Sequence, residues 1–157
     1  MIIIAGLLIL FTLEVAPLWR DAKVQIQRNF NAAELGFSPG ETPIAAMAEE
    51  YQQIGAALST TGRIHFFELA SGRGMGEFAN TFMQDGEIVT AAWQPLDGGI
   101  FAFVTNRGRF FWADVHFNPH FVQDKREFQP DVDFHEPITL ADGEAFIQSL
   151  TVAGTFD

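Results

Sequence analysis

The sequence contains no cysteine and has few basic residues. Without cysteine the chain forms no disulfide, no iron–sulfur cluster, no zinc–thiolate site and no thiolate nucleophile. Nine lysines and arginines stand against twenty aspartates and glutamates, so the formal net charge at pH 7 is -11. This charge opposes attraction to phosphate backbones, and we expect no nucleic-acid partner.

Tyrosine is scarce as well, because a single tyrosine accompanies seventeen phenylalanines. This bias predicts an aromatic core with few polar atoms. A chain of 157 residues is long enough for one domain with a substantial core. We expect two parts, which are an apolar anchor with a juxtamembrane helix over residues 1–35 and a globular head over residues 42–157.

The longest apolar run lies at the N-terminus. It reaches from Met1 to Trp19 and contains Glu14 and Pro17. At about 1.5 Å per residue, a helix of this length just matches the roughly 30 Å thickness of a bilayer's hydrocarbon core. We predict a single-pass transmembrane or filament-core helix here, and the alternative is a buried strand or helix of a soluble domain.

Two helical patterns follow this run. Apolar residues recur at spacings of three and four from Trp19 to Phe37, which favours an amphipathic helix. Thr42 and Pro43 are typical of an N-cap and a first helical position. The apolar spacing from Ile44 to Leu58 then predicts a second amphipathic helix.

The middle of the chain has the pattern of strands. Arg63 to Leu69 reads as one strand, and turn signals such as Asp85-Gly86 and Asn106-Arg107-Gly108 separate later ones. Connections this short exclude parallel pairing, so we predict an antiparallel β-meander of four to five strands. The four strands expected between Glu77 and Phe117 are Phe78–Gln84, Glu87–Trp93, Ile100–Thr105 and Arg109–Phe117.

The C-terminal third has less periodicity. The segment from Asn118 to Pro137 contains three prolines and reads as a long ordered loop. Asp142 is placed to cap a short helix from Gly143 to Leu150, and residues 151–156 can add an edge strand. Together these patterns predict an α+β fold.

The last strand of the meander has two different faces. Alternation places Phe111, Ala113, Val115 and Phe117 on the face that we expect to form the core. The opposite face begins with Phe110 and Trp112 and ends with Asp114 and His116. We therefore predict that Phe110 and Trp112 face either a helix of this chain or a binding partner.

Histidines and aspartates of two nearby stretches form a candidate metal site. Zinc and non-haem iron both use such mixed ligands. His116 and His120 are four residues apart, which places them on one face only in a helix, so histidines bonded within a loop are the favoured interpretation and no metal is expected. The candidate ligands are Asp114, His116, His120, Asp133 and His135.

The stretch from Ile64 to Gly74 resembles the first motif of class I methyltransferases that use S-adenosylmethionine. In that motif an apolar strand ends in an acidic residue and a glycine-rich turn leads into a helix. Glu87–Pro95 looks like the second strand of that family, and Arg109–Asp114 looks like the strand that ends beside the adenine. The resemblance implies a cofactor site made by Glu68, Gly72, Gly74 and Asp114.

The order of the elements is similar to that of type IV pilins and the minor pseudopilins. In those proteins an apolar N-terminal helix continues past a proline as an amphipathic helix and leads to an antiparallel head. The resemblance implies a helix packed in a membrane or a filament, with a head that contacts other subunits.

From these patterns we expect a non-enzymatic, membrane-anchored or complex-associated subunit with no cofactor, whose acidic head binds another protein or a second copy of itself. Residues 1–19 would hold it at a membrane, with the head periplasmic or extracellular. The alternative is a divergent methyltransferase-like domain in the cytoplasm, with S-adenosylmethionine as its cofactor.

Overall fold

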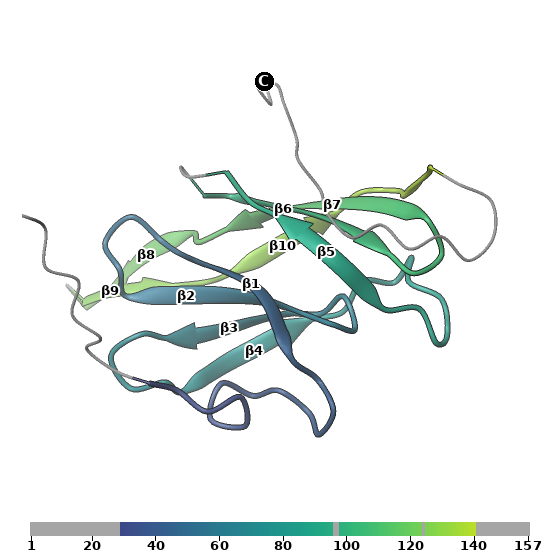
Figure 1. The fold of residues 1–157 in the computed structure, drawn as a ribbon. Coiled ribbons are helices and arrows are strands. Elements are labelled where there is room, and N and C mark those ends of the chain that lie inside the picture. The colour runs from purple at the N-terminus through teal and green to yellow at the C-terminus, as the bar shows by residue number, and fades with distance from the viewer. Residues whose placement is uncertain (1–28, 96–97, 124, 141–157) are drawn as a thin grey trace, which may run out of the picture.

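The computed structural model describes residues 29–95, 98–123 and 125–140, which form two antiparallel β-sheets packed face to face (Figure 1). We call the sheet formed first along the chain sheet A. Its strand order is β1-β2-β3-β4, so each strand pairs with the next one in the sequence. The strands are β1 (Pro43–Ala48), β2 (Ile54–Ser59), β3 (Ile64–Glu68) and β4 (Gly74–Phe78).

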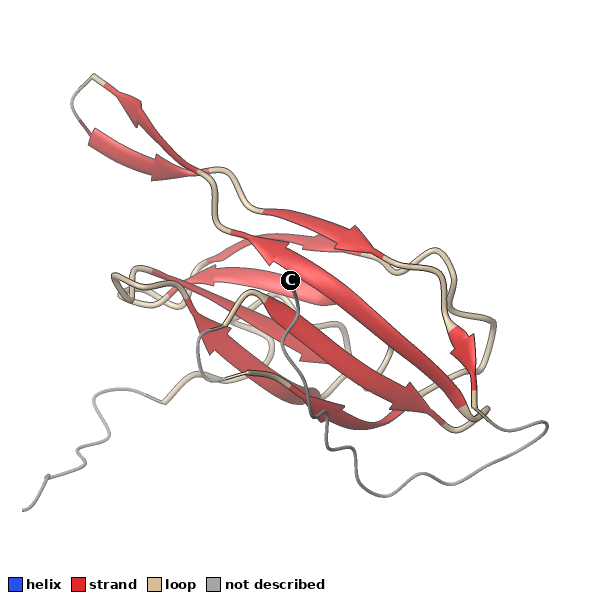
Figure 2. Ribbon diagram, turned by 90° about the horizontal axis from the view of Figure 1, so that it is seen from above, coloured by secondary structure: helices blue, strands red, loops and turns tan. Residues whose placement is uncertain are grey.

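The second sheet, sheet B, has the order β10-β7-β6-β5, and β11 also pairs with β7. Its strands are β5 (Val89–Trp93), β6 (Ile100–Thr105), β7 (Arg109–His116), β10 (Asp131–Phe134) and β11 (Ile138–Thr139). A separate hairpin of β8 (Pro119–Val122) and β9 (Lys125–Phe128) is inserted between β7 and β10. Figure 2 shows that this hairpin extends away from the two sheets.

The main core lies between the inner faces of the two sheets. Phe66 of sheet A meets Phe117 with ring centroids 5.8 Å apart, and Phe103 stacks on Phe111 at 5.2 Å within sheet B. Phe66, Phe103 and Phe111 have no exposed surface. Eight of the seventeen phenylalanines belong to this layer or pack against it, as alternating inward positions of a sandwich require.

The outer face of sheet A is covered by the segment that precedes β1. Phe37, Ala57 and Phe67 form a second apolar cluster on this face. The ring of Phe37 stacks on that of His65 with centroids 4.1 Å apart, and the ring of Phe30 lies 6.2 Å from that of Phe67. Residues 30–37 thus seal this face, and we call them the cover segment.

A buried carboxylate anchors the end of the cover segment to sheet A. Glu41 is 8% exposed and accepts hydrogen bonds from the backbone N–H of Ser38 at 2.9 Å, from Ser59 Oγ at 3.3 Å and from Thr61 Oγ1. Its Oε2 also lies 3.5 Å from His65 Nε2. Burial raises the pKa of Glu41, but the hydrogen bonds and the nearby histidine outweigh it, so the pKa lies below its usual value.

Residues 79–88 carry the chain from sheet A to sheet B and are held by another buried carboxylate. Glu87 accepts hydrogen bonds from Arg109, from Thr105 Oγ1 at 2.5 Å and from the backbone N–H of Gln84 at 2.9 Å. Burial raises the pKa of Glu87. The hydrogen bonds from Arg109 and Thr105 outweigh this effect, so the pKa lies below its usual value.

The predicted α+β class is wrong, because the described residues contain strands and turns and no helix. The second amphipathic helix, predicted from Ile44 to Leu58, is instead β1, a turn and β2. Of the helix predicted from Trp19 to Phe37, only residues 29–37 are described, and they form turns. Strand pairing, together with the burial of Met47 in β1 and of every residue of β2, overrides the helix propensity of these alanine-rich stretches.

The single-pass, pilin-like arrangement is also contradicted within the described residues. A pilin-like head would follow a long helix, but none of the described segments forms a helix that could cross a membrane. The apolar run over residues 1–19, on which the anchor prediction rests, lies outside the described residues.

Several strand predictions are confirmed. Ile100–Thr105 has the predicted bounds, and Arg63–Leu69, Glu87–Trp93 and Arg109–Phe117 correspond to β3, β5 and β7 within a few residues. The strand predicted over Phe78–Gln84 is wrong, because β4 ends at Phe78 and the chain crosses to the other sheet.

The predicted loop from Asn118 to Pro137 is wrong too, because it contains β8, β9 and β10. Pro119 opens β8, at an edge where its missing N–H costs no ladder bond. The helix predicted over Gly143–Leu150 and the strand over residues 151–156 lie outside the described residues.

Candidate binding surfaces

The outer face of sheet B carries two rows of mainly apolar residues that run across the strands. Paired residues in an antiparallel sheet point to the same side, so the strand register identifies these rows. One row is Trp93, Ala102, Trp112 and His135, and the other is Ala91, Val104, Phe110 and Ile138. We call the seven apolar members, Ala91, Trp93, Ala102, Val104, Phe110, Trp112 and Ile138, the aromatic face.

Aromatic rings cover the small residues in these rows. The rings of Phe110 and Trp112 stack with centroids 5.8 Å apart, and Trp112 also stacks on His135 at 5.0 Å. Ala102 and Val104 are fully buried, whereas Phe110 and Trp112 are partly exposed. Ile138 at one edge is 51% exposed. The structure therefore places the two residues singled out by sequence at the centre of an apolar surface.

The other half of the same face is acidic. Asp131 is paired with His116, and Asp133 with Asp114, so their side chains share this side of the sheet. His135 Nε2 lies 2.6 Å from Asp114 Oδ2, and His116 Nε2 lies 3.4 Å from Asp133 Oδ2. Each histidine is thus close to one carboxylate.

These contacts do not assemble the candidate metal site. His120 lies in the separate hairpin, where its Nε2 is 3.7 Å from Glu127 Oε2. The other four candidates share one face but form two histidine–aspartate pairs. Within residues 29–95, 98–123 and 125–140, no three histidine, aspartate or glutamate side chains are arranged to hold a metal ion.

The residues of the cofactor interpretation are also separated. Glu68 and Gly72 form the turn after β3, in which the Gly72 N–H donates to the Glu68 carbonyl at 2.7 Å. Gly74 begins β4, which pairs antiparallel with β3, where the methyltransferase motif requires a helix. Asp114 lies on the outer face of the other sheet.

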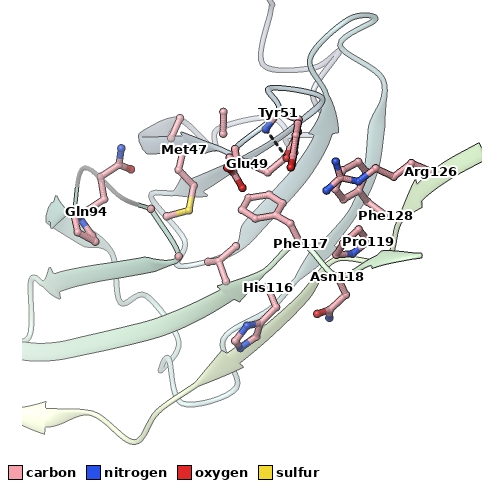
Figure 3. A pocket seen from close by; sticks show the side chains of 17 residues that line it. Met47, Glu49, Tyr51, Gln94, His116, Phe117, Asn118, Pro119, Arg126 and Phe128 are labelled. Atoms are coloured by element: carbon pink, nitrogen blue, oxygen red, sulfur yellow. Dashed lines mark hydrogen bonds between the residues drawn. The ribbon is translucent and has the colours of Figure 1, made fainter. Parts of the chain in front are cut away.

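A groove of about 820 Å³ lies at one end of the sandwich, between the β1–β2 turn and the base of the hairpin (Figure 3). Met47, Val115 and Phe117 supply its apolar floor. In Figure 3, Gln94 and Arg126 lie at opposite ends of the groove. Glu49 also lines it, and its carboxylate accepts the backbone N–H groups of Tyr51 at 2.8 Å and Gln53 at 2.6 Å.

Sequence reasoning did not find this groove. Its walls come from segments up to eighty residues apart in the chain, such as Met47 and Arg126, and the β1–β2 turn was read as part of a helix. Gln52 adopts a left-handed conformation in that turn, with φ 55°, at a position where no glycine signals it.

No known protein family and no curated protein sequence matches this chain.

Proposed function

We propose that the chain is a non-enzymatic subunit of a protein complex and that the aromatic face is the surface on which its partner docks. The proposal rests on the two apolar rows that cross the outer face of sheet B. Along the strands of such a sheet, apolar residues that face the core normally alternate with polar residues that face outward. Tryptophan and phenylalanine at these positions are instead typical of the centre of a protein interface.

The outer face of sheet A supports this interpretation by contrast. There the cover segment packs on Ala57 and Phe67 and completes an apolar cluster. Among the described residues, neither apolar cluster includes Phe110, Trp112 or Ile138 of the aromatic face. We propose that a partner protein packs on Phe110, Trp112 and Ile138.

The charges beside the aromatic face indicate the chemistry of that partner. Asp114, Asp131 and Asp133 lie on the same side of the sheet, next to the apolar rows. The whole chain has a net charge of -11. We therefore propose a partner with an apolar centre and a rim of lysine or arginine, because complementary charges speed association and exclude wrong partners.

Site-specific photocrosslinking in the source cells tests this proposal. A photoreactive phenylalanine analogue replaces Ile138 at the edge of the aromatic face, and in a matched control it replaces Phe82, which is 37% exposed on the loop between the sheets. We expect a discrete adduct with a protein of basic surface from position 138 and none from position 82. Adding Trp112→Ala should lower the adduct yield about tenfold, as expected for a central aromatic anchor.

Two results would contradict the proposal. Equal adducts from positions 138 and 82 would mean that the aromatic face is not selective. An adduct of twice the chain mass would show that a second copy, and not a different protein, covers the face. Purified Trp112→Ala protein that unfolds in one cooperative transition, with a free energy of unfolding lowered by no more than about 1 kcal/mol, serves as the folding control.

The methyltransferase alternative gains no support from an observation in the structure. The glycine turn leads into an antiparallel strand and not into a helix. Asp114, the other acidic residue of the implied cofactor site, lies in the other sheet.

A further inference from the structure

Arg126 differs from the other described arginines in what its guanidinium contacts. Arg63, Arg73, Arg107 and Arg109 each have a polar protein partner, which is Glu77, Glu68, the Asp85 carbonyl and Glu87, respectively. Arg126 lies over the rings of Tyr51 at 4.1 Å and Phe128 at 4.9 Å. Among the described residues, no carboxylate lies within ion-pair distance of it.

Stacking of this kind leaves the guanidinium ready to bind an anion. The planar group carries five N–H donors around its edge, and contact with aromatic faces occupies none of them. The two rings fix the orientation of the plane, so less side-chain entropy is lost when a ligand binds. A carboxylate is the partner that matches two parallel N–H donors.

The groove next to Arg126 fits the rest of such a ligand. Met47, Val115 and Phe117 line the groove with apolar side chains. In Figure 3, Met47 and Phe117 lie between Gln94 and Arg126. Ala46, Ala48, Gly98 and Gly99 line the walls with small side chains or none, which leaves room for a ligand. A ligand that fills the groove therefore needs an apolar body.

We infer that this groove binds a carboxylate carried on an apolar body, with Arg126 as the anion-binding residue. The terminal carboxylate of an apolar peptide and a free aryl- or alkyl-carboxylic acid share this chemistry. The site is separate from the partner surface proposed above, because Phe110 and Trp112 do not line the groove.

Arg126 sets the orientation of the ligand, because it is the one arginine or lysine among the described residues that line the groove. The Glu49 carboxylate is bonded to the backbone N–H groups of Tyr51 and Gln53, which disperse its charge. Glu50 is exposed at the rim and repels an anion. The ligand carboxylate accordingly lies at the Arg126 end, with its apolar body over Phe117.

A titration of the full-length chain with 3-phenylpropionate, followed by two-dimensional NMR of backbone amides, tests the inference. The neutral analogue 3-phenylpropanamide has the same shape and is the ligand control. We expect saturable shifts of residues around Phe117 and Phe128 with the acid, and binding at least about tenfold weaker with the amide, because a charge-assisted bidentate bond is lost. Equal affinity for the two compounds would overturn the inference.

Variants assign the effect to the residue. Arg126→Gln should weaken binding of the acid about tenfold and leave binding of the amide unchanged, whereas Arg73→Gln, which removes an exposed arginine of similar charge, should change neither. Glu50→Gln should strengthen binding of the acid about twofold by removing a like charge. Unchanged acid binding by Arg126→Gln protein with an unchanged thermal midpoint would contradict the role of Arg126.

An acetylated tetrapeptide ending in phenylalanine, made with a free or an amidated C-terminus, distinguishes the two sources of the carboxylate. Tighter binding of the free peptide than of 3-phenylpropionate identifies a chain terminus as the ligand, and the reverse order identifies a small acid. Failure of both acids to bind would overturn the inference.

Discussion

The outer faces of the two sheets both carry apolar residues, but they differ in what packs on those residues. On sheet A, the chain folds its own cover segment over the apolar residues and fastens it with the buried Glu41. On sheet B, the rings of Phe110 and Trp112 stack on each other, and among the described residues neither belongs to an apolar cluster. We propose that an apolar outer face forms core on sheet A, where the cover segment packs on it, and serves as a binding surface on sheet B.

The largest expected effect lies on the covered face. Phe37→Ala removes a ring that is 6% exposed and stacks on His65, and it should lower the free energy of unfolding by about 3 kcal/mol. Urea denaturation at pH 7 measures this change. Phe121→Ala is the matched control, because Phe121 is 75% exposed, and its change should stay within about 0.5 kcal/mol. A loss for Phe37→Ala as small as that for Phe121→Ala would mean that the cover segment is not part of the core.

The next effect concerns the carboxylate that fastens the cover segment. Glu41→Gln should cost about 2 kcal/mol at pH 7, because buried donors such as Ser59 Oγ lose a charged acceptor. The pKa values of Glu41 and Glu87 are lowered on folding, so each stabilises the fold above the usual pKa of a glutamate. This contribution is lost as the pH falls through the lowered values.

Stability measured from pH 7 downward checks that sign. The free energy of unfolding of the wild type should fall once the pH drops below 4.5, the ordinary glutamate value. The Glu41→Gln curve should fall less steeply, with Glu87 responsible for part of the remaining slope. Parallel curves for the two proteins would exclude a contribution from Glu41.

Gly72→Ala should have an intermediate effect. Gly72 has φ 76°, and a Cβ atom at this position would lie 2.6 Å from Phe30 Cδ1, so the substitution strains the turn and displaces the cover segment. We expect a loss of about 1.5 kcal/mol. Gly74→Ala is the control, since a Cβ there meets the Leu35 carbonyl oxygen only at 3.5 Å. Equal stability of the two variants would contradict this account.

The smallest loss of stability is expected on the aromatic face. Trp112→Ala removes a partly exposed ring whose described contacts are the rings of Phe110 and His135, so it should cost about 1 kcal/mol or less. Urea denaturation beside Phe37→Ala tests the comparison directly. A loss as large as that of Phe37→Ala would show that the aromatic face is part of the core of this chain.

Strands with strong alternation were predictable from the sequence. Ile100–Thr105 and Arg109–His116 combine β-branched or aromatic residues with a turn containing Gly108, which has φ 66°. The same alternation placed Phe110 and Trp112 on the outer face. Local patterns sufficed here because neighbouring strands of the sequence pair with each other.

The predictions from sequence were wrong where contacts between residues far apart in the chain decide the structure. Pro43–Ala48 and Ile54–Ser59 are rich in alanine and read as helix. Ile54–Ser59 becomes a strand because it is buried throughout, and Pro43–Ala48 becomes a strand because it pairs with it and buries Met47. Asp85-Gly86 does form a turn, with Gly86 at φ 71°, yet it belongs to the crossing between sheets and not to a hairpin. Arg126 gave no signal, because its two aromatic neighbours include Tyr51, which is far away in the sequence.

The order of the strands also has a consequence for how quickly the chain folds. Apart from the pairing of β7 with β10 and β11, each ladder joins strands that follow one another in the sequence. Such local ladders close short loops, which lowers the contact order and the entropic barrier of the search. The strands of each sheet can therefore pair, starting from their own turns, before the two sheets pack together. We expect a refolding rate in the fast range for β-sandwiches.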